Sequence, residues 1–210
     1  NELLARMAFV GGCTTALLIT DNFTLQHIRE TDDVDLIVEV LSYGDYEQLC
    51  RQLRDKGFRA SPEDDVICRW RLASLIVDVM PINEHILGFS NYWYPDALKY
   101  AANYPLSSGK NIRVVSPVYF LATKIEAFHG RGERNFLQSR DIEDIVSLVD
   151  GYESLCEEVQ LANDDVKQAI ATAIEHFLLV ADFEYAVQSV AQDSQREQLL
   201  FERLQRLATG

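Results

Sequence analysis

Three aspartates with apolar neighbours have types and spacing that suit metal chemistry. Asp33 and Asp35 stand in "TDDVDLIV", and Asp78 stands in "LIVDVM". Because side chains alternate along a strand, Asp33 and Asp35 share one face while Val34 and Leu36 point to the other. Three carboxylates without His or Cys suit Mg²⁺ or Mn²⁺, and two such ions clamp the attacking and leaving oxygens in phosphoryl or nucleotidyl transfer.

The Asp-rich stretch also has a simpler interpretation, a solvated turn that feeds a strand. Closely spaced carboxylates repel one another and cost stability unless a cation offsets them. Asp32, directly before the pair, fits the solvated turn. The metal interpretation requires that the strand with Asp33 and Asp35 and the strand with Asp78 are neighbours in one sheet.

A glycine pair precedes these aspartates. Gly11-Gly12 follows the apolar run "MAFV" and leads into "CTTALLIT", which reads as a helix. Backbone N–H groups at such a strand-to-helix turn can hold an anionic ligand. A glycine pair alone is more often a tight turn, and the later Asp-x-Asp strand makes the pattern more specific.

The N-terminal part alternates between strands and helices, and the C-terminal part is helical. Ser116-Pro117 predicts a helix start, with Ser as N-cap and Pro at the first helical position. We expect an α+β fold with a mixed sheet and helices in residues 1–115, followed by a helical domain in residues 116–210. The expected strands are 7–10, 33–40, 66–72, 74–81 and 111–115, with 66–72 and 74–81 forming a hairpin. The expected helices are 13–20, 45–57, 117–129, 138–149, 152–160, 163–180 and 182–207, and residues 83–97 read as irregular.

Composition is typical of an ordinary globular protein. The chain has 210 residues, 48% hydrophobic content and a net charge of −14, which disfavours non-specific nucleic-acid binding but allows a local basic cleft. Four scattered cysteines without a ligand pattern indicate reduced thiols. There is no signal-peptide pattern and no apolar run of membrane-spanning length. We therefore expect a cytoplasmic protein with no membrane partner.

The order of these motifs resembles the DNA polymerase β-like nucleotidyltransferase superfamily. "FVGG", "TDDVDLIV" and "LIVDVM" stand where that superfamily has its glycine turn, Asp-x-Asp strand and third carboxylate. "VVSPVYFLATKIEAFHGRG" and "SRDIEDIVSLVDG" look like the AbiEii-type nucleotidyltransferases, a group that includes toxins of abortive-infection and MenT-type toxin–antitoxin systems. The resemblance spans residues 8–150, and Gly12 departs from the Ser of many relatives.

This resemblance implies a Mg²⁺- or Mn²⁺-dependent enzyme that moves a nucleotide from an NTP such as ATP to an acceptor hydroxyl on tRNA or protein. It also implies a cognate antitoxin as a partner. Catalysis and metal binding would belong to Asp33, Asp35 and Asp78. Nucleotide binding would belong to Gly11, Gly12, Thr14, Lys124 and Asp141, with Asp144 as the other candidate for the acidic position.

Several residues keep two interpretations. Lys124 is either a nucleotide ligand or a long side chain along an amphipathic helix. Arg29 either meets a phosphate or offsets the aspartates. We expect a nucleic-acid acceptor to bind a basic cleft of Lys124, Arg131, Arg134 and Arg140, although "GRGER" (130–134) also reads as a linker. The alternatives for the whole protein are a non-catalytic nucleotide-binding or interaction module and a small-molecule, antibiotic-like nucleotidyltransferase.

Overall fold

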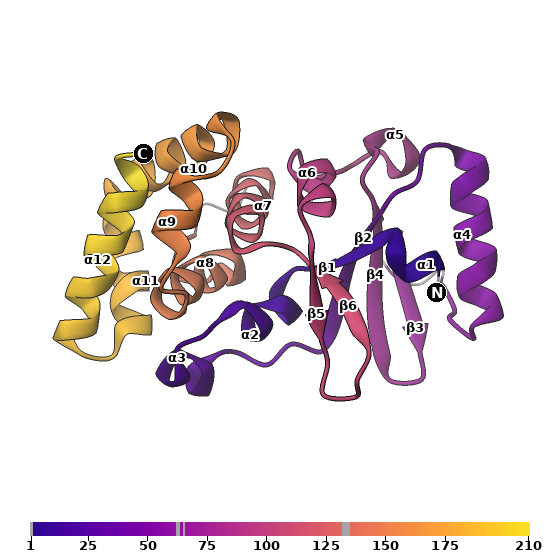
Figure 1. Cartoon of the computed structure of the whole chain (residues 1–210), viewed down its shortest axis with the longest axis horizontal. Coiled ribbons are helices and arrows are strands. Elements are labelled where there is room, and N and C mark those ends of the chain that lie inside the picture. The colour runs from indigo at the N-terminus through magenta and orange to yellow at the C-terminus, as the bar shows by residue number, and fades with distance from the viewer. Residues whose placement is uncertain (1, 62–63, 65, 132–134) are drawn as a thin grey trace. The chain divides into compact units, whose positions relative to one another are not determined.

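A computed structural model of the chain describes residues 2–61, 64, 66–131 and 135–210 (Figure 1). The fold is α+β. Its Cα positions form two compact units, one from residues 1–14 and 30–116 and the other from residues 15–29 and 117–210. The first unit contains the sheet, and the second is helical.

The sheet is six-stranded and mixed, in the order β3-β4-β2-β1-β6-β5 (Figure 1). Its strands are β1 (Met7–Val10), β2 (Asp33–Val38), β3 (Arg69–Leu72), β4 (Leu75–Pro81), β5 (Ala102–Pro105) and β6 (Asn111–Val114). β2 is parallel to β4 and β1 is parallel to β6, whereas the β1–β2, β3–β4 and β5–β6 pairs are antiparallel. The predicted hairpin and the predicted adjacency of the two Asp-bearing strands are therefore confirmed.

One face of β2 and β4 packs in the hydrophobic core of this unit. Helix α4 (Tyr43–Asp55) begins after the N-cap Ser42, whose hydroxyl accepts from the backbone N–H of Asp45. The core joins this helix to the strands through Val38, Leu49, Leu53, Trp70, Val77 and Val79. Because strand side chains alternate, the aspartates of β2 and β4 lie on the other face.

Residues 82–110 are more regular than the sequence predicts. They contain α5 (Glu84–Leu87), α6 (Tyr94–Lys99) and the strand β5. Helix α5 ends at Gly88 in the left-handed conformation, with φ 79°. These elements are too short to leave a periodic pattern, which explains why the sequence does not predict them. Two other short elements of this unit are α1 (Glu2–Ala5) and the 3₁₀ turn η1 (Gly12–Thr14).

The second unit is a group of helices. They are α2 (Thr15–Leu18), α3 (Asn22–His27), α7 (Pro117–Gly130), α8 (Arg140–Gly151), α9 (Leu155–Gln160), α10 (Asp164–Leu178), α11 (Ala181–Ala191) and α12 (Ser194–Ala208). Helix α7 begins at Pro117, as predicted. The single helix predicted over 182–207 is wrong. Helix α11 ends at Gln192, which has a φ of 60°. Asp193 is the N-cap of α12, and its side chain accepts from the backbone N–H groups of Gln195 and Arg196.

Residues 15–29 pack within the helical unit, although the division at 115/116 assigns them to the α/β core. The backbone N–H groups of Thr20 and Asp21 donate to the Gly151 carbonyl oxygen at 3.0 and 3.1 Å. A Cβ added at Gly151 would lie 2.6 Å from Ile19 and 2.9 Å from Thr24. The missing side chain of Gly151 therefore allows this segment to approach the end of α8.

Two expectations from composition bear on the fold. All four cysteines are free thiols. Across the residues that the structure describes, no helix is both long enough and apolar enough for a membrane crossing.

Candidate functional site

Asp35 and Asp78 are direct neighbours on parallel strands. The register of β2 and β4 pairs Asp35 with Asp78 and Asp33 with Ile76. Paired positions of adjacent strands point to the same face, and Asp33 shares the face of Asp35 by alternation. The structure thus gathers the three predicted carboxylates on one face of the sheet, where Asp78 is 7% exposed.

Gly11 lies directly against the Asp35 carboxylate. A Cβ added at Gly11 would overlap the Oδ2, Cγ and Cβ atoms of Asp35, and Gly11 has a φ of 70°. Only glycine adopts this conformation at little cost and also leaves room for the carboxylate. The glycine turn and the Asp-x-Asp strand therefore form one local arrangement in the first unit.

The hydroxyl of Thr14 is used inside the same turn. It donates to the Gly11 carbonyl oxygen at 2.8 Å, and the Thr14 backbone N–H donates to the same oxygen at 3.1 Å. Thr14 is also fully buried. Its observed role is to shape the turn in which Gly12 begins η1.

Arg69 is the site residue that the sequence interpretation missed. Its Nε donates to Asp78 Oδ1 at 2.9 Å, and its Nη2 donates to Asp78 Oδ2 at 2.7 Å. The hydrogen bonds to Asp78 raise the pKa of the Arg69 guanidinium. Burial raises the pKa of the neighbouring Cys68 thiol to about 12, with a further contribution from the Asp78 charge, so this cysteine is a protonated, unreactive thiol at neutral pH.

Asp33 and Asp35 lie on one face of β2 and offer the oxygen donors that a hard divalent cation prefers. Asp78 differs, because both of its carboxylate oxygens already accept from Arg69. Within the described ranges, no three His, Cys, Asp or Glu side chains are arranged to hold a metal ion together. The described side chains therefore do not form the predicted three-carboxylate metal site. Arg69 holds both oxygens of Asp78, and Asp33 and Asp35 stay the candidate ligands of a cation.

Lys124 and Asp141, both predicted for nucleotide binding, contact each other in the helical unit. Lys124 Nζ lies 3.2 Å from Asp141 Oδ1 and 2.6 Å from Asp144 Oδ2. Lys124 is only 9% exposed. Burial lowers its pKa, but the charges of Asp144 and Asp141 outweigh burial and hold the pKa above its ordinary value. The ammonium is thus charged at neutral pH and engaged by two aspartates.

The arginines near this cluster are paired as well. Arg131 Nη1 lies 2.9 Å from Asp141 Oδ2, and Arg29 lies 3.3 Å from Glu143 Oε2 and 3.8 Å from Asp144 Oδ1. Two members of the predicted basic cleft, Lys124 and Arg131, are thus paired with aspartates, and binding of a nucleic-acid acceptor at this cleft stays a prediction. Arg134 lies outside the described residues.

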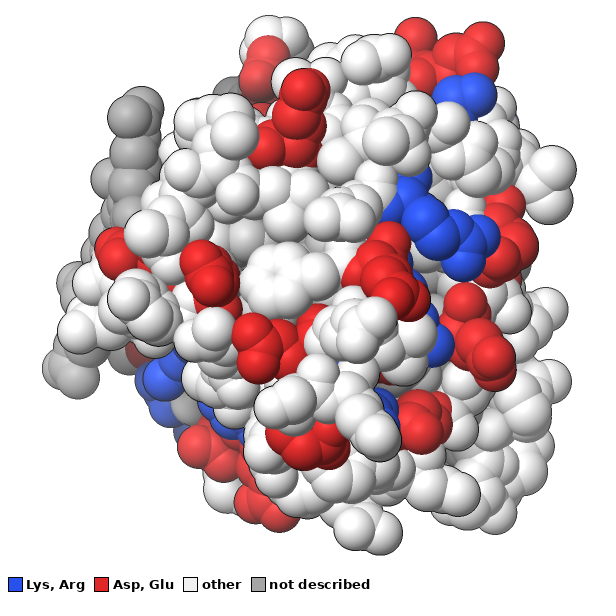
Figure 2. Space-filling model, turned by 90° about the vertical axis from the view of Figure 1, so that its left-hand side faces the viewer, with Lys and Arg blue, Asp and Glu red and all other residues white. Residues whose placement is uncertain are grey.

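Acidic side chains also spread over the helical elements. Figure 2 shows a face on which Asp and Glu are scattered among uncharged residues and Lys and Arg form no continuous patch. This agrees with the sequence of residues 150–195, which contain one Lys and no Arg. Such a surface repels phosphate chains and restricts any nucleic-acid contact to local sites.

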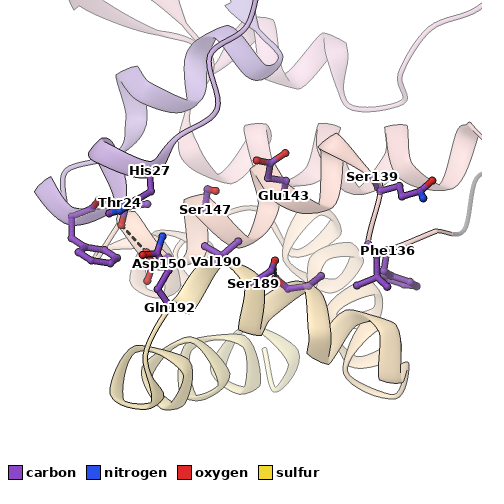
Figure 3. A pocket seen from close by; sticks show the side chains of 14 residues that line it. Thr24, His27, Phe136, Ser139, Glu143, Ser147, Asp150, Ser189, Val190 and Gln192 are labelled. Atoms are coloured by element: carbon purple, nitrogen blue, oxygen red, sulfur yellow. Dashed lines mark hydrogen bonds between the residues drawn. The ribbon is translucent and has the colours of Figure 1, made fainter.

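Cavities open among the described residues of the helical unit, and two of them bear on the predicted site. The larger, of about 340 Å³, has a polar lining that includes Thr24, Glu143, Ser147, Asp150 and Ser189 (Figure 3). The Thr24 hydroxyl donates to Asp150 Oδ2 at 2.7 Å, and Arg196 also binds that carboxylate. None of the predicted site residues lines this cavity.

The smaller cavity adjoins the lysine cluster. It has a volume of about 180 Å³ and is lined in part by Arg131, Arg140 and Asp141. Three residues named by the sequence interpretation thus share one small hollow at the start of α8.

Comparisons with known proteins find similarity among solved structures. No protein-family model matches the chain, and no curated protein matches it. Among solved structures, the chain is similar to the solution structure of the antibiotic-resistance factor ANT(2″)-Ia, with 16% identity over 83% of this chain and 84% of that chain and a TM-score of 0.41. A functional assignment therefore depends on the residues of this chain.

Proposed function

We propose that this protein is a metal-dependent nucleotidyltransferase with a polymerase β-like catalytic core. The observation that carries the proposal is the register of β2 and β4, which sets Asp35 beside Asp78 with Asp33 on the same face. The close approach of Gly11 to Asp35 supports it, because it sets a strand-to-helix turn, whose backbone N–H groups can bind phosphates, beside the carboxylates. A structural role alone would not require carboxylates to gather beside a glycine turn.

The residues of this chain take distinct roles in that reaction. Asp33 and Asp35 would hold the cation, and the backbone N–H groups of the Gly11-Gly12 turn would bind the β- and γ-phosphates. A bound Mg²⁺ or Mn²⁺ supplies charge neutralisation for the triphosphate and for the leaving pyrophosphate. Asp78 would join Asp33 and Asp35 as a ligand of the cation and would favour deprotonation of the acceptor hydroxyl.

Lys124 and Asp141 act on the nucleotide as a pair. The Asp141 and Asp144 carboxylates hold the Lys124 ammonium in one position, so its positive charge is placed before the nucleotide binds. The motif resemblance extends the proposal to an AbiEii-type toxin that modifies tRNA or protein and is restrained by a cognate antitoxin. The acidic surface favours an acceptor that presents one end or one hydroxyl to the site over a long nucleic-acid duplex.

Transfer of labelled phosphate tests this proposal. The protein is incubated with Mg²⁺ and each NTP, labelled at either the α- or the γ-phosphate, together with total RNA, cell protein or a small-molecule extract. We expect an α-labelled product and no γ-labelled product, because nucleotidyl transfer keeps the α-phosphate and releases pyrophosphate.

Each other result has a defined meaning. A γ-labelled acceptor indicates phosphoryl transfer and rejects the proposal. An α-labelled small molecule retains the reaction class and rejects the toxin interpretation. Absence of label from every acceptor, with no NTP binding, favours a non-catalytic module.

A further inference from the structure

Arg69 and Asp78 form a two-pronged ion pair at the proposed metal site. β3 and β4 are antiparallel, and their register sets Arg69 opposite Asp78. Two hydrogen bonds, of 2.9 and 2.7 Å, use both carboxylate oxygens. Charge-assisted pairs of this geometry are stronger than single contacts. The pair is also shielded, with side-chain exposures of 23% for Arg69 and 10% for Asp78.

The positive charge of Arg69 offsets the repulsion among the three aspartates. Asp33, Asp35 and Asp78 lie on one face of adjacent strands, and like charges at that spacing repel. Arg69 supplies a positive charge where a divalent cation would otherwise supply it. While Arg69 uses both oxygens, Asp78 has reduced capacity for a metal ion or an acceptor hydroxyl.

We propose that Arg69 is an exchangeable internal cation that competes with the divalent metal for Asp78. The inference rests on the proposed nucleotidyltransferase function and adds a positioning residue to it. Without metal, Arg69 fixes the Asp78 carboxylate and offsets the repulsion among the aspartates. On metal binding, Arg69 gives up at least one of its two hydrogen bonds, and no covalent bond changes.

Arg71 is a matched control on the same strand. It lies two residues from Arg69, so it shares the same face, and it makes its own two-pronged pair with Asp64 at 3.1 and 2.6 Å. Arg71→Ala removes the same type of side chain from β3 and leaves the Arg69–Asp78 pair intact. An effect on metal binding that is specific to Arg69 must be absent in this variant.

The test measures Mn²⁺ binding in the presence of a non-hydrolysable NTP analogue, by electron paramagnetic resonance. We expect Arg69→Ala to bind Mn²⁺ on the order of tenfold more tightly than the wild type, because a charge-assisted competitor is removed. We expect Arg71→Ala to bind as the wild type does. Arg69→Lys keeps the positive charge but lacks the two-pronged guanidinium, so its Mn²⁺ affinity should lie between those of Arg69→Ala and the wild type. In metal-free buffer, Arg69→Ala should also have a lower melting temperature than Arg71→Ala.

The outcomes separate this inference from the function on which it rests. Unchanged or weaker Mn²⁺ binding in Arg69→Ala, with binding that Asp35→Asn abolishes, overturns the competition and leaves the proposed metal site standing. Absence of Mn²⁺ binding in both the wild type and Arg69→Ala overturns both proposals.

Discussion

Gly11 packs so closely on Asp35 that no other side chain fits between the glycine turn and the carboxylate. The contact joins the end of β1 to β2, and the β1–β2 register pairs the preceding residue, Val10, with Asp35. The glycine therefore fixes the position of one proposed metal ligand as well as the path of the chain.

Gly11→Ala should strongly slow nucleotide transfer at a modest cost in stability. The new Cβ would displace the Asp35 carboxylate, and a misplacement of that size can cost about a hundredfold in rate. The positive φ adds roughly 1–2 kcal/mol of strain. Chemical denaturation and the transfer assay measure the two effects separately.

Gly109→Ala is the matched control for this variant. Gly109 has a φ of 78° but has nothing within 4 Å of an added Cβ. It should therefore show the strain and keep full transfer. Equal transfer by the two variants would contradict the role of the Gly11–Asp35 contact.

Lys124→Met should destabilise the helical unit by about 3–5 kcal/mol. Removing Lys124 leaves Asp141 to Arg131 and Asp144 to the more distant Arg29, so buried negative charge loses its nearest compensation. Lys167→Met is the control, because Lys167 pairs with Asp164, whose side chain is 94% exposed, and surface pairs contribute about 0–1 kcal/mol. Urea unfolding of both variants decides the point, and equal losses would count against a buried network.

The same pair should give a stability loss at high pH. The pKa of Lys124 is raised above the ordinary lysine value of 10.5 in the folded protein, because the charges of Asp144 and Asp141 outweigh burial. A raised lysine pKa stabilises the fold fully below the unfolded-state pKa, and this contribution is lost as pH rises through the folded-state pKa. The stability difference between the wild type and Lys124→Met should therefore be constant near neutral pH and shrink only above about 10.5. Shrinkage already at pH 8 would contradict the raised pKa.

Gly151→Ala should loosen the attachment of residues 15–29 to α8. The added methyl group meets Ile19 and Thr24, and overpacking of this type costs about 1–3 kcal/mol. Gly130→Ala, at the end of α7, has open space around its Cβ and should be neutral or slightly stabilising. Hydrogen exchange of the Thr20 and Asp21 amides, which donate to the Gly151 oxygen, gives a local readout. Unchanged protection in Gly151→Ala would show that the segment does not depend on this approach.

Local patterns in the sequence predicted the elements that carry the aspartates. Short runs rich in β-branched and other apolar residues predicted β2 and β4, and Ser116-Pro117 predicted the start of α7. The break at Gln192 has no Gly or Pro, so the pattern continued through it, although Asp193-Ser194 is a usable N-cap signal. No local sequence pattern indicates that residues 15–29 pack in the helical unit, because this packing depends on a distant residue, Gly151.

The pairing of Arg69 with Asp78 could have been predicted from the sequence. A hairpin with the two-residue loop Ala73-Ser74 pairs Leu72 with Leu75, and counting back along the strands then sets Arg69 opposite Asp78. The pairing of Lys124 with Asp144 could not be predicted from the sequence, because it depends on how α7 packs on α8. Periodicity gives the face of each helix but not the partner of one side chain.

The central claim is tested most directly by α-labelled nucleotide transfer in the Asp33→Asn/Asp35→Asn double variant. We predict that Mg²⁺-dependent transfer is abolished, while the metal-free protein unfolds at the same or a higher denaturant concentration because like charges are removed. Asp32→Asn, at the exposed neighbouring position, should transfer as the wild type does. Transfer by the double variant at the wild-type rate would contradict the metal site and, with it, the proposed function.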